Sequence, residues 1–168
     1  MKTYLKLVFY IICILFLSAC YKPSSNVASG FLGDNIYVKT IINKEDPLNS
    51  VYINDLFLEY MMGRFHKNIV SEDKADTKII IEIKNLSFNP LYYNKDGYAL
   101  EYKVDLHIKF NIYKFEVLDE IDTISSYTFY LPQNSVIGDV LKDEAIKKAS
   151  KDNFDEFISL IAIKGFKQ

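Results

Sequence analysis

Residues 100–112 read Leu-Glu-Tyr-Lys-Val-Asp-Leu-His-Ile-Lys-Phe-Asn-Ile, with an apolar side chain at every even position and a polar one at every odd position. A β-strand points successive side chains to opposite faces, so this pattern predicts one long strand with a buried face and a wet face. At about 3.3 Å per residue the strand would span roughly 40 Å. We expect a strand of this length to project beyond the helices.

The flanking segments predict three more strands. Residues 36–42 alternate in the same way and predict a first strand, Thr77–Phe88 a second, and Glu120–Leu131 a fourth. Asn89-Pro90 is expected to end the regular pairing of the second strand, since proline cannot donate to a ladder. Asp96-Gly97 indicates the turn that leads into the long strand.

Two helices complete the pattern. Asp46-Pro47 predicts a helix start, because aspartate caps free amides and proline suits the first position. This helix should run to Met62, with Gly63 as its stop, and its apolar surface suits packing on the sheet or a partner. A last helix is expected from about Ser135 to Lys164. The order β-α-β-β-β-α predicts an α+β two-layer sandwich, a four-stranded, mostly antiparallel sheet covered on one face by two helices.

The N-terminus has the pattern of a secretory signal. Lys2 and Lys6 flank the start of an apolar run from Leu7 to Leu17, which is shorter than the roughly 20 residues of a membrane span. A buried N-terminal helix is the alternative, but such a helix would show a polar face. The following Leu-Ser-Ala-Cys at 17–20 resembles the lipobox of bacterial lipoproteins, which implies cleavage before Cys20 and a covalent lipid on Cys20.

Three segments follow from this resemblance. They are a lipoprotein signal peptide at 1–19, a lipidated tether at 20–35, and an α/β domain at 36–168. Removal of Lys2 and Lys6 lowers the formal charge from −2 to −4, and acylation leaves no free thiol. Two or more acyl chains anchor a protein stably. Tyr21 after the cysteine, where aspartate retains lipoproteins in the inner membrane of enteric-type bacteria, implies the outer membrane.

Little in the chain suggests catalysis. His66 and His107 have no partner at metal-ligand spacing, and His107 is expected on the wet face of the long strand. Glu101 and Asp105 share that face, but Lys103 between them indicates an ordinary charged surface. We therefore expect no enzyme, no catalytic or metal site and no cofactor except the lipid. The lysines near residue 148 alternate with acids, which predicts i,i+4 pairs on a solvated helix face and no nucleic-acid partner.

Four segments, in their order along the chain, resemble the LptE family of lipopolysaccharide-assembly lipoproteins, most nearly its Campylobacter-like version. They are Cys20–Ser25, Glu45–Ser50, the hairpin Asn94–Tyr102, and Glu144–Lys147 in the last helix. The resemblance implies an outer-membrane lipoprotein that faces the periplasm and the lumen of the β-barrel LptD. Its expected role is to plug LptD and to assist the assembly and insertion of lipopolysaccharide. The alternative is a free outer-membrane lipoprotein that binds a small ligand or assists another envelope machine.

The resemblance also implies lipopolysaccharide-binding residues. Lys95 matches a basic residue just before the hairpin turn, and Lys142 is the nearest candidate for a second one, although Asp139 lies about where that position falls. Tyr92, Tyr93 and Tyr98 either contact sugars and acyl chains or pack the hairpin. The family has glycine after the lipidated cysteine, whereas this chain has tyrosine.

Overall fold

The structure, a computed structural model, is a two-layer α+β sandwich and describes residues 28, 30–115, 117–132 and 137–165. The predicted signal peptide and Cys20 lie outside the described residues. The sheet contains β1 (Asn35–Ile41), β2 (Asn68–Ile69), β3 (Thr77–Tyr93), β4 (Ala99–Lys114) and β5 (Val117–Tyr130). The helix layer contains α3 (Pro47–Phe65) and α4 (Asp139–Gly165), and a short 3₁₀ turn, η1 (Glu72–Lys74), precedes β3.

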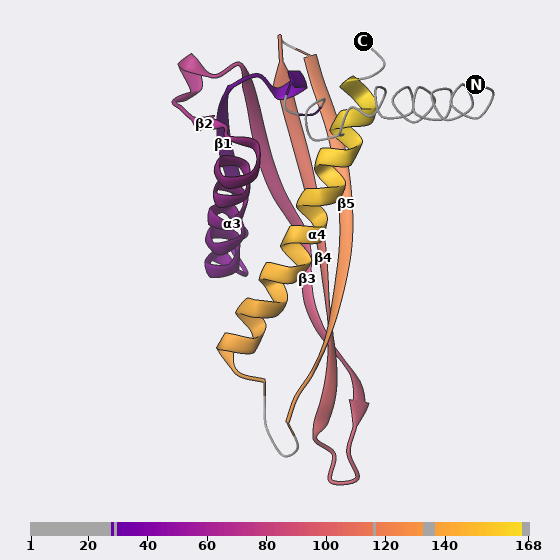
Figure 1. The fold of residues 1–168 in the computed structure, drawn as a ribbon. Coiled ribbons are helices and arrows are strands. Elements are labelled where there is room, and N and C mark those ends of the chain that lie inside the picture. The colour runs from indigo at the N-terminus through magenta and orange to yellow at the C-terminus, as the bar shows by residue number, and fades with distance from the viewer. Residues whose placement is uncertain (1–27, 29, 116, 133–136, 166–168) are drawn as a thin grey trace, which may run out of the picture.

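The sheet is mixed, with the strand order β2-β1-β3-β4-β5. The long strands β3, β4 and β5 pair with one another in antiparallel fashion, whereas β1 pairs in parallel with both β2 and β3. Both helices lie on one face of the sheet (Figure 1), so the predicted fold class is confirmed. The predicted sheet lacked β2, because a two-residue strand leaves no alternation to read.

The core forms where β4 faces the helices. Val104, Leu106, Ile108, Phe110 and Ile112 are all buried, as their even positions predicted. The Phe110 ring stacks on Phe157 of α4 with 4.1 Å between centroids and lies 5.6 Å from Phe57 of α3. These contacts tie both helices to the same strand.

A β-bulge in β3 changes which residues face the core. Ile83 pairs with Ile108 and Asn85 with His107, so Lys84 has no partner on β4. Before the bulge Ile79 and Ile81 are buried at odd positions, whereas after it the partly buried Leu86 and Phe88 lie at even positions. Bulges also increase the local twist of a strand pair. The distal half of the hairpin thus keeps an apolar face toward the helix layer.

Helix α3 extends past its predicted stop. Gly63 lies inside the helix, which ends at Phe65 because His66 adopts the left-handed conformation with φ 51°. The added turn buries Phe65, whose ring lies 5.5 Å from that of Tyr60. The predicted N-terminal cap is present, since the Asp46 carboxylate accepts a hydrogen bond from the Asn49 amide.

The described end of the predicted tether packs against the core of the domain. Ala28, Phe31 and Leu32 are buried in the core, and residues 30–32 are helical. Lys114 at the end of β4 donates to the Phe31 carbonyl, and its ammonium lies 4.7 Å from the centre of the Phe31 ring. The alternation that predicted β1 gave no signal for this segment, whose apolar residues follow a helical spacing.

Candidate functional site

The hairpin of β3 and β4 projects beyond both helices and ends in the predicted tyrosine and lysine residues (Figure 1). Tyr92 is 60% exposed, and Tyr93, Tyr98 and Lys95 are exposed beside it on the same turn. The structure therefore brings these four predicted site residues together. The three tyrosine rings are open to solvent.

Asn94 fixes the conformation of the turn. Its side-chain oxygen accepts hydrogen bonds from the amides of Asp96 at 3.0 Å and Tyr98 at 2.8 Å, and its own amide donates to the Tyr98 carbonyl at 2.8 Å. Gly97 has φ 85°, a left-handed conformation that glycine adopts at no steric cost. Lys95 is thus displayed at the apex of a hydrogen-bonded turn.

A further tyrosine joins the tip from β5. Tyr92 pairs with Glu101, and Glu101 pairs with Tyr130, so the three residues form one row across three strands. Tyr130 is 73% exposed, and a hydrogen bond to the Glu101 carboxylate raises the pKa of its hydroxyl. Sequence reasoning missed Tyr130, because only the register between β4 and β5 shows that it lies beside Tyr92.

Aromatic side chains stiffen the hairpin on the face toward the helices. Tyr102 of β4 stacks on Phe129 of β5 with 6.0 Å between centroids, and Phe129 stacks on Tyr127 at 6.4 Å. The Lys148 ammonium of α4 lies 5.8 Å from the centre of the Tyr127 ring. This row links the N-terminal half of α4 to the projecting hairpin.

Lys142 is placed apart from the other predicted site residues. It lies in the first turn of α4, which begins short of the hairpin tip (Figure 1), and its ammonium is 3.7 Å from Asp139. No contact within the described residues joins Lys142 to the tip. The tip and Lys142 are therefore two separate candidate positions.

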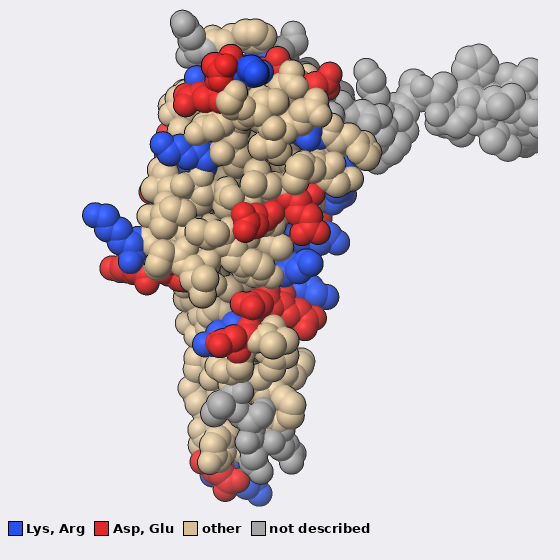
Figure 2. Space-filling view, turned by 90° about the vertical axis from the view of Figure 1, so that its left-hand side faces the viewer, with Lys and Arg blue, Asp and Glu red and all other residues tan. Residues whose placement is uncertain are grey.

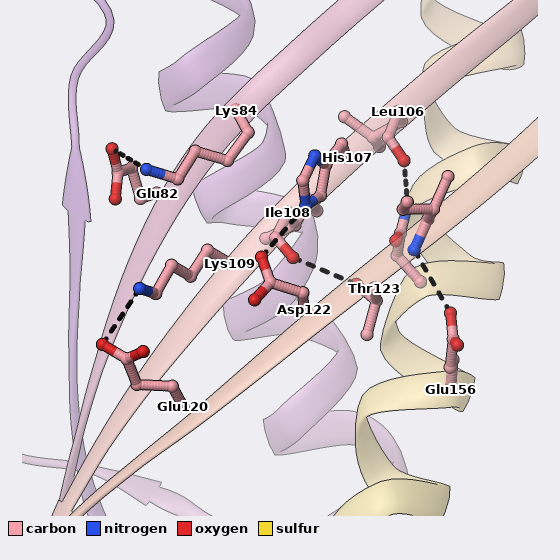
Figure 3. A network of polar contacts seen from close by, with 12 residues as sticks. Glu82, Lys84, Leu106, His107, Ile108, Lys109, Glu120, Asp122, Thr123 and Glu156 are labelled. Carbon is pink, nitrogen blue, oxygen red and sulfur yellow. Dashed lines mark hydrogen bonds and ion pairs between the residues drawn. The ribbon is translucent and has the colours of Figure 1, made fainter.

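The open face of the sheet is a network of paired charges (Figure 3). His107 pairs with Asp122 at 3.0 Å and Lys109 with Glu120 at 2.9 Å, both across β4 and β5. Hydrogen bonds lower the pKa of Asp105, and the bond from Lys103 has a larger effect than the bond from Ser126. A carboxylate held ionised in this way is a poor proton donor at neutral pH. The arrangement suits a solvated face.

A groove of about 510 Å³ runs between α3 and α4. Leu56, Tyr60 and Phe154 supply its apolar wall. Charged side chains of both signs also line it: Glu59 and Arg64 from α3, and Glu144, Lys147, Lys148 and Lys151 from α4. None of these lysines forms an ion pair among the described residues, so the predicted i,i+4 pairs are absent there. Binding sites for small molecules commonly have 300–1,000 Å³, so the volume is suitable for a ligand.

The charges elsewhere are mixed. Viewed from the α3 side, acidic and basic groups alternate over the surface with uncharged areas between them, and neither sign forms a continuous patch (Figure 2). No group of three or more potential metal ligands occurs within the described part of the chain. Among the described helices, none is long and apolar enough to cross a membrane.

Similar structures identify the fold. The sequence matches no family model, and no curated protein is similar to it in sequence. The crystal structure of a candidate lipoprotein from Caulobacter crescentus matches with a TM-score of 0.57 and 8% identity, over 87% of this chain and 100% of that one. The two chains share a fold.

Two further lipoproteins are similar at a lower level. Rare lipoprotein B from Shewanella oneidensis has a TM-score of 0.49 and 10% identity, over 75% of this chain and 95% of its own. A minor lipoprotein from Acinetobacter baumannii has a TM-score of 0.48 and 9% identity, over 78% of this chain and 92% of its own.

Proposed function

We propose that this protein is an outer-membrane lipoprotein of the LptE kind, anchored through Cys20. In this proposal it plugs the barrel of LptD and presents lipopolysaccharide for insertion. The observation that carries the proposal is the projecting hairpin, whose ordered turn displays Lys95 beside Tyr92, Tyr93 and Tyr98. The lipobox-like segment and the fold shared with a candidate lipoprotein support the anchor.

The chemistry of the tip suits lipopolysaccharide. An exposed ammonium pairs well with phosphate or carboxylate groups, and tyrosine rings offer both an apolar face and a hydroxyl. A chain with a formal charge of −4 after cleavage gives no broad attraction to an anionic lipid. In this proposal recognition is local, and the exposed ammonium of Lys95 at the tip supports placing it there.

Reversing the charge at the tip tests this assignment. Lys95→Glu is expected to weaken capture of lipopolysaccharide about tenfold, the effect of losing one hydrogen bond to a charged group. The matched control is Lys39→Glu, which makes the same charge change at an exposed position on β1. Equal binding by both variants in a lipopolysaccharide pull-down would remove Lys95 from the site.

Partner capture tests the plug role. Affinity purification of the acylated protein from outer membranes should return a β-barrel protein of the LptD class in stoichiometric amount. Recovery of the lipoprotein alone, under detergent conditions that keep outer-membrane complexes intact, would contradict the plug role while leaving the lipid anchor unaffected.

The groove between α3 and α4 favours a second candidate function. An apolar wall beside lysines and glutamates suits a small amphiphilic ligand that carries charged groups, and the protein would then be a free lipoprotein that binds such a ligand. Mass spectrometry of the natively purified protein would detect a bound ligand. Loss of that ligand in Lys147→Glu, with lipopolysaccharide capture unchanged, would favour this function over the first.

A further inference from the structure

The turn between β4 and β5 carries a cluster of exposed apolar side chains. Phe115 is 85% exposed and Val117 61%, and Tyr113 and Leu118 are exposed as a cross-strand pair beside them. Single exposed apolar residues are normal, but contiguous ones mark a surface that meets a partner or a membrane. This cluster lies at the opposite end of β4 from the hairpin tip (Figure 1).

The backbone holds Phe115 in an unusual conformation. Its φ of 48° is in the left-handed region, which a large aromatic residue rarely adopts. Glycine would take this conformation without strain. Phe115 is the first residue of the two-residue loop that joins the paired residues Lys114 and Val117, and loops of this length commonly require a positive φ. The chain thus carries a large exposed ring at a position where glycine or asparagine is usual.

The same turn lies next to the start of the described chain. Lys114 contacts both the carbonyl and the ring of Phe31, which places Phe31 against the end of β4. Cys20 precedes Ala28 by eight residues, so an extended chain between them spans at most roughly 28 Å. The sixteen residues of β4 cover roughly 50 Å. A lipid on Cys20 is therefore held near the turn and far from the hairpin tip.

We infer that the β4–β5 turn inserts Phe115, Val117 and Leu118 into the interfacial layer of the membrane that holds the lipid, with the hairpin tip at the opposite end of the molecule. This inference rests on the lipid-anchor part of the proposed function. Phenylalanine, leucine and valine lose water-exposed apolar area in that layer, which is favourable in proportion to the area. Because the turn and the lipid are at the same end of the molecule, their joint insertion would orient the long axis at a steep angle to the plane of the membrane.

Tryptophan fluorescence tests the inference, because the chain contains no tryptophan. The acylated protein is reconstituted into phosphatidylcholine vesicles, either plain or brominated on the acyl chains. Phe115→Trp and Val117→Trp report on the turn, and Tyr92→Trp is the matched exposed control at the tip. Side chains 5–10 Å deep in the interface approach the bromines, so we expect roughly twofold quenching at the turn and none at the tip.

The outcomes separate the inference from the function on which it rests. Equal emission in plain and brominated vesicles for both turn reporters, or equal quenching at turn and tip, would overturn the inference while the acyl mass confirms the anchor. A protein that lacks the acyl mass and does not float with vesicles would refute the anchor and the inference together. Circular dichroism of each variant verifies that it is folded.

Discussion

The side-chain amide of Asn153 is fully buried between α4 and the sheet, and the groups around its nitrogen act as hydrogen-bond acceptors. Its nitrogen lies 2.6 Å from the Ser125 hydroxyl, 3.2 Å from the Leu106 carbonyl and 3.3 Å from the Ala149 carbonyl. Asn153→Asp places an unpaired carboxylate against those carbonyls, so we expect a loss of about 3–5 kcal/mol in the free energy of unfolding.

The isosteric apolar variant is the control for this prediction. Asn153→Leu removes the amide, but Ser125 still donates to the Ala149 carbonyl at 2.7 Å. We therefore expect a smaller loss, about 1–2 kcal/mol. Urea denaturation at pH 7 measures both variants, and an Asp variant as stable as the Leu variant would contradict the assignment of the amide nitrogen as the buried donor.

Tyr60 links the two helices through Asp155. Its hydroxyl donates to the Asp155 carboxylate at 2.5 Å, and Arg64 pairs with the same oxygen. Burial raises the pKa of Tyr60, and the hydrogen bond to Asp155 raises it further by a smaller amount. A hydroxyl that binds its proton more tightly in the folded state contributes stability below pH 10, its ordinary pKa, and loses it as the pH rises through the higher folded value.

Tyr60→Phe should therefore flatten the alkaline part of the stability profile. The wild type is expected to lose stability steadily above pH 10, whereas the variant lacks this titration and falls less steeply. Guanidinium unfolding at pH 8, 10 and 11 measures the difference. Parallel profiles for the two proteins would show that the Tyr60 hydroxyl is not coupled to folding.

At the scale of the elements, the bulge at Lys84 sets which side chains of β3 face the helices. Deletion of Lys84 would align Ile83 and Asn85 as neighbours, in register with Ile108 and His107, and would keep Leu86 and Phe88 on the core face. We expect this variant to fold with a loss of about 1 kcal/mol or less, since only the pair of Lys84 with Glu82 is removed.

Deletion of Ser87 is the contrasting case. It lies two residues past Asn85 in a regular part of the ladder, so its removal shifts the strand beyond it by one residue and turns Phe88 to the open face. We expect a clearly lower urea midpoint for this variant than for the Lys84 deletion. Equal midpoints would mean that the bulge does not determine the register.

Elements with a strong repeat were predictable, and those set by tertiary pairing were not. The alternation in 100–112 gave β4 and its buried face, but nothing local in β3 predicts that Lys84 is skipped; the three-residue step from Ile83 to Leu86 is the only signal. Pro90 broke the regular pairing as expected, yet β3 continues to Tyr93. Beyond Glu82 no strand among the described residues pairs with the outer edge of β3, and proline is tolerated at such an edge.

In the candidate site, too, some residues could be placed from the local sequence and others could not. Lys95 and its neighbouring tyrosines could be placed on the turn, because Asp96-Gly97 specifies that turn locally. Tyr130 and the row of Tyr102, Phe129 and Tyr127 depend on the β4–β5 register, and the groove depends on the spacing of two helices. Such arrangements arise between segments distant in sequence, so no local pattern reveals them.

At the scale of the whole molecule, the fold separates the body from the tip. The buried core includes no residue between 91 and 100, and the turn at Asn94 is held by its own hydrogen bonds. The stability of the body should therefore not depend on the tip, although the tip carries the proposed ligand contacts. The two properties can be tested independently in one variant.

Replacement of residues 93–100 by a two-residue Asn-Gly turn makes that test, because it removes Tyr93, Lys95 and Tyr98. Asn-Gly closes a tight hairpin with the twist that flanking strands require, so Tyr92 and Glu101, which pair across β3 and β4, can be joined directly. We expect the free energy of unfolding to stay within about 1 kcal/mol of the wild type, the range typical of changes away from the core, while lipopolysaccharide capture is lost. The shortened protein should still co-purify with the β-barrel partner if the body of the domain forms the plug. A shortened protein that still binds lipopolysaccharide as tightly as the wild type would relocate the site to the body, where the lysine-lined groove between α3 and α4 is the surface to examine.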